Sequence, residues 1–360
     1  MLKPRHLLVV FLLALGFVIT ALVLAGNQTS EQGAGAPLFP KLLGRLNDVT
    51  RVTISAAGKS FNIENSELGW HIPLQDNYRA DANKMHKLLV GLSGLKRIEA
   101  KTRKPSLYQA IGVRDPAAGV PNSKAITLSD KAGTPLLQLI VGLSRPARAD
   151  PSSEEYYVRR VGDPQSWLVE GVLPQVGSHV SDWLDKKIVM IDASRLQQTV
   201  VTHADGEVVT AYREAPKDRN FSYRELPEGR QLADEWRMND LGRFIADLDS
   251  QGVYAKANAP AADAMLEVQS QTFDGLLIKL RASQAKDQGV YVELAAAYDG
   301  HLANTGNVFK DDNLKSADQV HAEVEQLNRR WQGWVYKLPK FKADYLRKRQ
   351  ADFLKKQPAN

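Results

Sequence analysis

The residues that could bind a metal ion are spread along this 360-residue chain without local pairing. Two imidazoles at H-x-H, H-x-x-H or H-E-x-x-H spacing can share one metal ion, and no such pair occurs. The absence of cysteine excludes thiolate zinc sites, iron–sulfur clusters and cysteine nucleophiles. We therefore expect no local metal site, although a site assembled from distant residues stays open. The histidines are His6, His71, His86, His179, His203, His301 and His321.

Motifs for nucleophilic or phosphate chemistry are incomplete. The segment AGKS at residues 57–60 resembles the end of a phosphate-binding loop, but Thr53 occupies the position of the first glycine. In the segment GLSRP, Pro146 replaces the second glycine of a nucleophile elbow. Ser93 with Lys96, and Ser283 with Lys286, match S-x-x-K without the accompanying S-D-N or K-T-G motif. We expect a protein that is not an enzyme, with no catalytic residue and no cofactor.

Paired carboxylates are the remaining candidates for acid–base chemistry or cation binding. Asp182/Asp185 and Asp247/Asp249 are each close in sequence, whereas glycosidase carboxylates come from separate elements and one of them must be desolvated. Asp311-Asp312-Asn313 lacks the alternating ligands and the glycine of a calcium loop. All three groups are therefore predicted to be surface charge.

The net charge of +6 is concentrated at the two ends of the chain. Lys3 and Arg5 precede an apolar segment, and residues 337–356 carry eight basic side chains against two acidic ones. The rest of the chain is nearly neutral, so the six tryptophans have no basic groove beside them and are predicted to anchor cores. Nucleic-acid binding is therefore disfavoured.

Residues 7–25 predict a membrane anchor. They form a 19-residue stretch without charge in which Thr20 is the one polar side chain, and about 20 apolar residues suffice to span a bilayer. Cleavage as a signal peptide after Ala25 is the alternative. Because Lys3 and Arg5 lie before the stretch, we expect a single-pass protein of the inner (cytoplasmic) membrane with a cytoplasmic amino terminus and a periplasmic body. Residues 1–26 would form the anchor, and residues 27–47 would form a flexible tether.

The remaining elements predict an α+β fold with two repeated modules. Residues 49–64 alternate as a hairpin, and Asp81 can cap a helix with apolar residues at Met85, Leu88, Leu89 and Leu92. A meander of strands follows over residues 125–170, and the same order recurs in the second half, with a helix face formed by residues 241–248. We expect modules at 48–190 and 191–338, with helices covering one face of mainly antiparallel sheets.

The carboxyl-terminal residues follow a different pattern. Residues 314–334 predict a longer helix, and residues 339–360 predict a basic helix and tail with Phe341, Tyr345 and Phe353 on one side. Three interpretations stay open: packing on the second module, a solvated helix, or contact with a partner or with anionic headgroups.

Several short motifs resemble the DUF4340 family. They are GWHIP at residues 69–73, LYQAIGV at 107–113, YYVR at 156–159 and WVYKLP at 334–339. The sequence departs from the family at Gln109-Ala110, where a glycine more often follows the tyrosine. The resemblance implies no established activity and no catalytic residue. It also implies an association with ABC-type transport components of the gliding-motility auxiliary kind.

The function that we expect is therefore that of a non-catalytic accessory or scaffold of an ABC-type transport system. A periplasmic ligand-binding module that uses the cleft between the two modules is the alternative, and an uncharacterised hydrolase is third.

Overall fold

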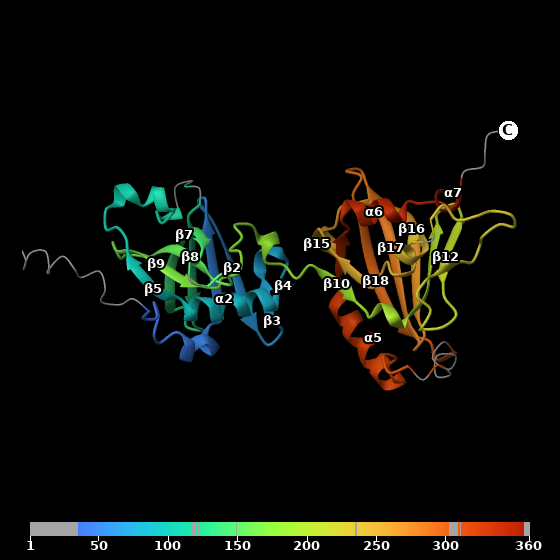
Figure 1. Cartoon of the computed structure of the whole chain (residues 1–360), viewed down its shortest axis with the longest axis horizontal. Helices are drawn as coiled ribbons and strands as arrows, with labels where there is room; N and C mark the ends of the chain where they lie inside the picture. Colours follow the sequence, from blue (N-terminus) through green and yellow to red (C-terminus); the bar gives the residue numbers. More distant parts are fainter. Residues whose placement is uncertain are drawn as a thin grey trace, which may run out of the picture. The chain divides into compact units, whose positions relative to one another are not determined.

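The computed structural model describes residues 35–116, 120, 122–148, 150–234, 236–301, 309 and 311–355. The predicted anchor at residues 7–25 lies outside these residues. Among the helices of the described ranges, none has the length and hydrophobicity needed to cross a bilayer. The chain divides into two compact units after Asp185 (Figure 1).

The first unit is built on a nine-stranded antiparallel sheet with the order β4-β3-β2-β1-β6-β7-β8-β9-β5. Its strands are β1 (Arg51–Ala56), β2 (Lys59–Ser66), β3 (Gly69–Ile72), β4 (Tyr78–Arg79), β5 (Lys96–Ala100), β6 (Lys124–Ser129), β7 (Pro135–Pro146), β8 (Glu154–Arg160) and β9 (Ser166–Gly171). The predicted hairpin is present: β1 pairs with β2, and Gly58 turns between them at φ +76°.

Both faces of this sheet are covered. Leu139 and Ile140 are fully buried neighbours on β7, and neighbours on a strand point to opposite faces. Helix α2 (Ala82–Gly94) buries Met85, Leu88, Leu89 and Leu92, as its spacing predicts. The predicted cap is also present, because the Asp81 carboxylate accepts a hydrogen bond from the Lys84 N–H at 3.0 Å.

Residues 35–47 belong to the first unit, which corrects this part of the tether predicted at 27–47; residues 27–34 lie outside the described residues. The N–H of Gly35 donates to the Arg97 carbonyl at 2.8 Å, and the N–H of Leu38 donates to the Leu95 carbonyl at 2.7 Å. Leu38 is fully buried, and a short 3₁₀ helix, η1 (Leu43–Asp48), leads into β1. Burial of the apolar Leu38 side chain favours packing of this segment on the first unit. Its Gly- and Pro-rich composition had suggested a flexible tether instead.

The second unit contains an eight-stranded antiparallel sheet with the order β13-β12-β11-β16-β17-β18-β19-β15. Read strand by strand, this order repeats β3-β2-β1-β6-β7-β8-β9-β5 of the first unit, so the predicted repeat extends to the sheet topology. The strands are β11 (Leu196–His203), β12 (Val208–Tyr212), β13 (Ser222–Tyr223), β15 (Gly252–Ala255), β16 (Ala262–Thr272), β17 (Leu276–Ala285), β18 (Val290–Tyr298) and β19 (Trp334–Lys337).

The boundary between the units lies five residues before the predicted one. Strand β10 (Lys187–Met190) pairs with β14 (Asp247–Asp249) in a separate two-stranded ribbon, so residues 187–190 belong to the second unit. Strand β14 also corrects the helix face predicted over residues 241–248. Helix α3 (Trp236–Gly242) ends before it, and buried Leu248 lies between exposed Asp247 and Asp249.

The predicted longer helix is α5 (Ala317–Trp331), which lies between β18 and β19 and contacts β18. The first unit has a short turn at the corresponding place, between β8 and β9. Both units are therefore mixed α+β with antiparallel sheets, and strands dominate over helices among the described residues.

The carboxyl-terminal segment packs on the second unit as two short helices, α6 (Lys340–Leu346) and α7 (Gln350–Phe353), where the sequence predicted one. The Asp352 carboxylate accepts a hydrogen bond from the Arg349 N–H at 2.9 Å, at the start of α7 as a separate helix. Leu346 and Phe353 are each 1 % exposed, and the Tyr345 hydroxyl donates to the Arg237 carbonyl. Docking on the second unit is thus the interpretation that the structure supports.

Candidate functional site

Two of the three carboxylate groups identified in the sequence, Asp182/Asp185 and Asp247/Asp249, take part in structural contacts. Asp185 pairs with Arg79 at 2.9 Å, and the Asp182 carboxylate accepts a hydrogen bond from the His179 N–H at 3.0 Å. Asp247 and Asp249 both pair with Lys187 of β10. Partial burial opposes the charge of Lys187, but the hydrogen bonds to these two carboxylates raise the lysine pKa. Each pair therefore has a cationic partner that explains its position.

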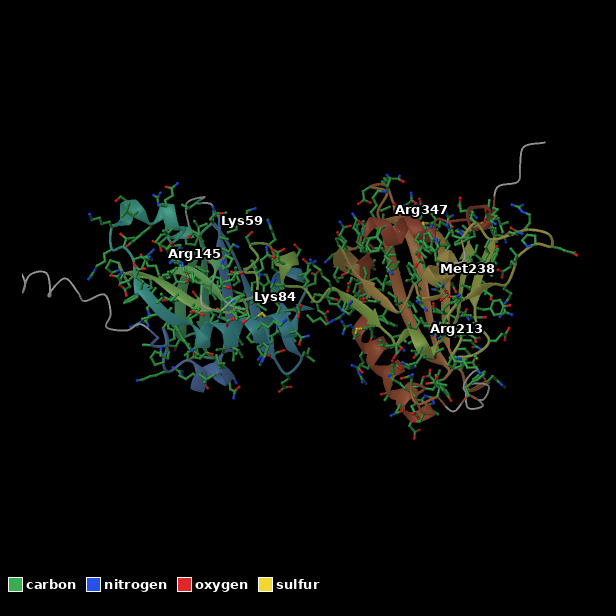
Figure 2. All side chains as sticks on the ribbon, viewed as in Figure 1. Lys59, Lys84, Arg145, Arg213, Met238 and Arg347 are labelled. Carbon is green, nitrogen blue, oxygen red and sulfur yellow. The ribbon has the colours of Figure 1, made fainter. Side chains whose placement is uncertain are left out.

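The remaining sequence candidates stay dispersed. Lys59 of the AGKS segment lies at the end of the β1–β2 hairpin (Figure 2). The Ser93 hydroxyl donates to the Val90 carbonyl within α2. Within the described ranges, no three His, Asp or Glu side chains come close enough to hold a metal ion. Trp183 and Trp331 are buried core residues as predicted, whereas Trp236 is 56 % exposed and corrects the prediction that all six are anchors.

The family-like segment at residues 107–113 closes the second face of the first sheet. Tyr108 donates to the Pro164 carbonyl at 2.6 Å and lies under the buried guanidinium of Arg159, 4.7 Å from its ring centroid. Arg159 in turn donates to the Val113 carbonyl at 3.0 Å. Gly112, at φ +70°, rests against Gly142, where a Cβ would lie 2.2 Å from the Ile111 carbonyl oxygen. These motif residues therefore hold a loop onto a sheet.

A buried ion network in the second unit is the strongest electrostatic feature of the described residues. Arg195 comes from the 3₁₀ turn η7 (Ala193–Arg195), Asp274 from the β16–β17 turn and Glu323 from α5. The Arg195 Nε donates to Asp274 at 2.7 Å, and its Nη2 donates to Glu323 at 2.8 Å. The side chains are 3 %, 2 % and 14 % exposed, in that order.

All three groups of this network are charged at neutral pH. Burial disfavours the two carboxylates, but hydrogen bonds from Arg195 overcome it and lower the pKa of both Asp274 and Glu323. The Lys315 ammonium reaches Glu323 at 3.0 Å, and the Lys315 N–H donates to Asp274 at 2.9 Å. A carboxylate that is held ionised and hydrogen-bonded is a poor proton donor at neutral pH, so the network ties α5 to the sheet.

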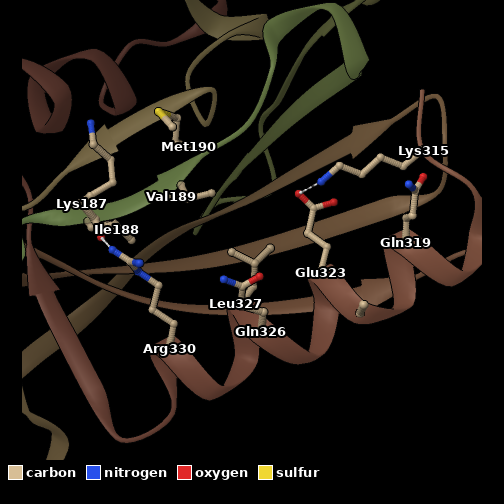
Figure 3. Close-up of a pocket in the computed structure, with 11 residues that line it drawn as sticks. Lys187, Ile188, Val189, Met190, Lys315, Gln319, Glu323, Gln326, Leu327 and Arg330 are labelled. Atoms are coloured by element: carbon tan, nitrogen blue, oxygen red, sulfur yellow. Dashed lines mark hydrogen bonds and ion pairs between the residues drawn. The ribbon is translucent and has the colours of Figure 1, made fainter. Parts of the chain in front are cut away.

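A groove of about 550 Å³ lies beside this network, between β10 and α5 (Figure 3). Helix α5 is joined to the backbone of β10 by two side chains: Arg330 donates to the Lys187 carbonyl, and Trp331 donates to the Ile188 carbonyl at 2.9 Å. Met190 lines the groove and is 74 % exposed. We name this feature the α5 groove, and it is lined by residues 187–190 together with Lys315, Gln319, Ala322, Glu323, Gln326, Leu327 and Arg330.

A larger groove of about 860 Å³ lies on the first unit, between α2 and the segment that follows β9. Val90 and Val172 line it and are 42 % and 62 % exposed. Gly91 lets the two elements touch, because a Cβ there would lie 2.2 Å from the Val172 carbonyl oxygen. We name this feature the α2 groove. Its charged and imidazole side chains are His86, Lys87, Lys96, Asp150 and Glu170.

The sequence did not reveal either the ion network or the grooves. Asp274 and Glu323 lie 79 and 128 residues from Arg195, so no local spacing marks them. The exposed apolar residue Val172 directly follows β9, and Met190 is the last residue of β10, where exposure is decided by the neighbouring helix. The most useful local signal is Gly91 inside α2, since a glycine in a helix interior often marks a close approach.

The fold and its surfaces define a class of duplicated antiparallel-sheet proteins with helix-lined grooves; among the described residues, no three metal-ligating side chains lie together. The chain belongs to the DUF4340 family, described as a domain of unknown function, whose family model matches residues 70–267. The match runs from β3 of the first unit into β16 of the second. No curated protein and no solved structure matches the chain.

Proposed function

We propose that this protein is a single-pass, membrane-anchored envelope protein whose two sheet units act as a non-catalytic scaffold of an ABC-type transport system. The family resemblance supports the transport partner. The apolar stretch at residues 7–25, preceded by Lys3 and Arg5, supports the anchor and the periplasmic position of the units.

The observation that carries the proposal is the pair of grooves with exposed apolar side chains. Val172 in the α2 groove and Met190 in the α5 groove lie at 62 % and 74 % exposure among polar neighbours. An apolar patch rimmed by polar residues is typical of a protein–protein contact. By contrast, the charged groups with the strongest contacts are engaged in structural pairs such as Arg195–Asp274.

Site-specific crosslinking tests the proposal. A photo-reactive side chain replaces Val172 or Met190 in the full-length chain, and Lys59, on an exposed hairpin, serves as the matched control position. After irradiation of membranes, we expect an ATP-binding or membrane-spanning transport subunit to be crosslinked from a groove position and not from position 59. Recovery of no transport component from either groove would contradict the scaffold.

The anchor is tested separately on the same preparation. Mass spectrometry of the intact protein should show an amino terminus upstream of residue 7. A new amino terminus at Gly26 would show cleavage after Ala25 and would remove the anchor from the proposal.

Binding of a small periplasmic ligand is a second candidate. The volume of the α2 groove, about 860 Å³, falls in the range of small-molecule sites. A ligand bound there should raise the melting temperature of the protein, and Val172→Glu should abolish that shift while Val161→Glu, at an exposed position of the same unit, should retain it.

A further inference from the structure

The first residues of the structured chain form a small surface with both apolar and basic side chains. Leu43 of η1 is 67 % exposed, Lys41 beside it is exposed, and the Arg45 side chain is 50 % exposed. A cavity of about 370 Å³ lies against these residues. We name this feature the η1 surface, and it consists of Phe39, Pro40, Lys41, Leu42, Leu43, Arg45, Leu136 and Arg160.

The η1 surface carries three basic side chains, Lys41, Arg45 and Arg160, and two carboxylates lie beside one of them, Arg45. The guanidinium of Arg160 stacks 4.8 Å from the Phe39 ring centroid and donates to the Leu38 carbonyl. Burial, together with the nearby charge of Arg97, lowers the pKa of Arg160, and the Asp163 carboxylate opposes this effect. Arg45 pairs with Asp48 at 3.0 Å and lies 4.0 Å from the Asp130 carboxylate, whereas Lys41 is exposed and adds a further positive charge.

The position of the η1 surface in the chain determines what it can reach. Gly35 is fixed to β5 through its hydrogen bond to Arg97, and nine residues separate it from Ala25. Nine residues span at most about 30 Å when fully extended, and about 17 Å on average as a flexible linker. If residues 7–25 span the bilayer, the η1 surface is therefore held next to the membrane.

We propose that the η1 surface binds anionic phospholipid headgroups, with Lys41, Arg45 and Arg160 facing the phosphates and Leu43 entering the interfacial layer. This inference rests on the proposed membrane anchor. Exposed apolar side chains flanked by lysine and arginine bind anionic membrane surfaces through both apolar burial and charge attraction. The contact would fix one face of the first unit toward the membrane and thereby orient the scaffold.

Fluorescence quenching in reconstituted vesicles tests the proposal on the full chain. The protein has no cysteine, so Gly44→Cys introduces a unique labelling site beside Leu43, at a position with no atom within 4 Å of a new Cβ. Lys59→Cys provides the control label. It lies across the six-residue strand β1 from η1, about 20 Å away. Lipids with a spin label near the headgroup are the quencher.

In vesicles that contain phosphatidylglycerol, we expect the label at position 44 to be quenched and the label at position 59 to remain bright. Lys41→Gln with Arg45→Gln should reduce this quenching by about half or more, as should pure phosphatidylcholine or high salt. The matched pair Lys59→Gln with Arg114→Gln, both exposed in the same unit, should leave it unchanged. Circular dichroism of each variant verifies the fold.

Two outcomes overturn the inference. Equal quenching at positions 44 and 59 would show that the η1 surface has no preferential contact with the membrane. Quenching that is equal in the two lipid compositions would exclude recognition of the anionic headgroup. Flotation with vesicles after an alkaline carbonate wash reports the anchor independently. A protein that floats without quenching at position 44 retains the anchor and loses this inference, whereas a protein that does not float loses both.

Discussion

Removing Arg195 should destabilise the second unit and make its stability depend on pH in a specific direction. Arg195→Met keeps the approximate volume of the side chain but leaves Asp274 and Glu323 buried without their shared cation. Breaking one partner of a buried ion pair costs about 3–5 kcal/mol. Asp274 retains the Lys315 N–H and the Thr272 hydroxyl, and Glu323 retains the Lys315 ammonium. We therefore expect a loss near the lower end, about 3 kcal/mol.

The sign of the pH effect follows from the two carboxylates. In the native protein their pKa is lowered, so they contribute stability above the ordinary carboxyl pKa of about 4 and lose it as the pH falls. In Arg195→Met, burial dominates and raises the pKa, so the destabilisation is present at neutral pH and is relieved as the groups protonate. The penalty should shrink by about 1 kcal/mol or more between pH 7 and pH 4.5.

Urea unfolding followed by hydrogen exchange and mass spectrometry measures this effect for each unit separately. Arg281→Met is the matched control, because Arg281 lies on β17 with its side chain 79 % exposed and 3.7 Å from Glu267. Exposed pairs contribute at most about 1 kcal/mol, so the control should change little and show no pH-dependent penalty. A loss under about 1 kcal/mol for Arg195→Met, or a penalty that does not shrink in acid, would refute the reasoning.

Two further substitutions test packing. Gly91→Ala should lower the free energy of unfolding by about 1–3 kcal/mol, because its Cβ would lie 2.2 Å from the Val172 carbonyl oxygen. The control Gly94→Ala, on the same helix, meets no atom within 4 Å and should be neutral or slightly stabilising in urea unfolding. Phe353→Ala should lower the free energy of unfolding by about 3–5 kcal/mol, because that ring is 1 % exposed. The control Phe341→Ala, at 70 % exposure, should change it by no more than about 0.5 kcal/mol. Equal effects of the two variants in thermal melts would argue against docking of the carboxyl-terminal helices.

Local patterns predicted those parts of the fold that depend on local physics. The cap at Asp81 and the apolar spacing of α2 gave the helix correctly, because both act within one or two turns. The alternation over residues 49–64 likewise predicted the first hairpin, which is present as β1 and β2. The repeat became visible because hairpin, helix and meander each carry such a local signal in both halves.

The prediction of a helix over residues 241–248 was wrong because the same spacing of apolar residues is compatible with a helix and with a strand. Leu241, Phe244, Ile245 and Leu248 have helical spacing and are all buried, yet Leu248 is on strand β14. Its exposed neighbours Asp247 and Asp249 alternate with it, which is the period of a strand, and both reach Lys187 across the ribbon. That lysine is about 60 residues away in sequence, so only the tertiary pairing could decide between the two readings.

The ion network and the grooves could not be predicted from the sequence, because they too depend on tertiary contacts between distant residues. The ion network joins three elements, and its members have no spacing that distinguishes them from surface charge. The grooves depend on which edge a helix covers, and that differs between the two units. In the second unit, helix α5 packs beside β10 and forms the α5 groove with it. In the first unit, the groove is formed instead by α2 and the segment that follows β9.

This difference bears on function. The two units share the order of eight strands, so their sheets provide the same support. Their exposed apolar residues nevertheless lie in unlike settings: Val172 beside a helix on the first unit, and Met190 at the end of a ribbon on the second. Two copies of one binding site would be expected to resemble each other at the groove, whereas two sites for different partners would share only the sheet. The proposed scaffold therefore predicts different contacts for the two grooves. Crosslinks from positions 172 and 190 should identify different peptides, and the same crosslinked peptide from both would contradict this.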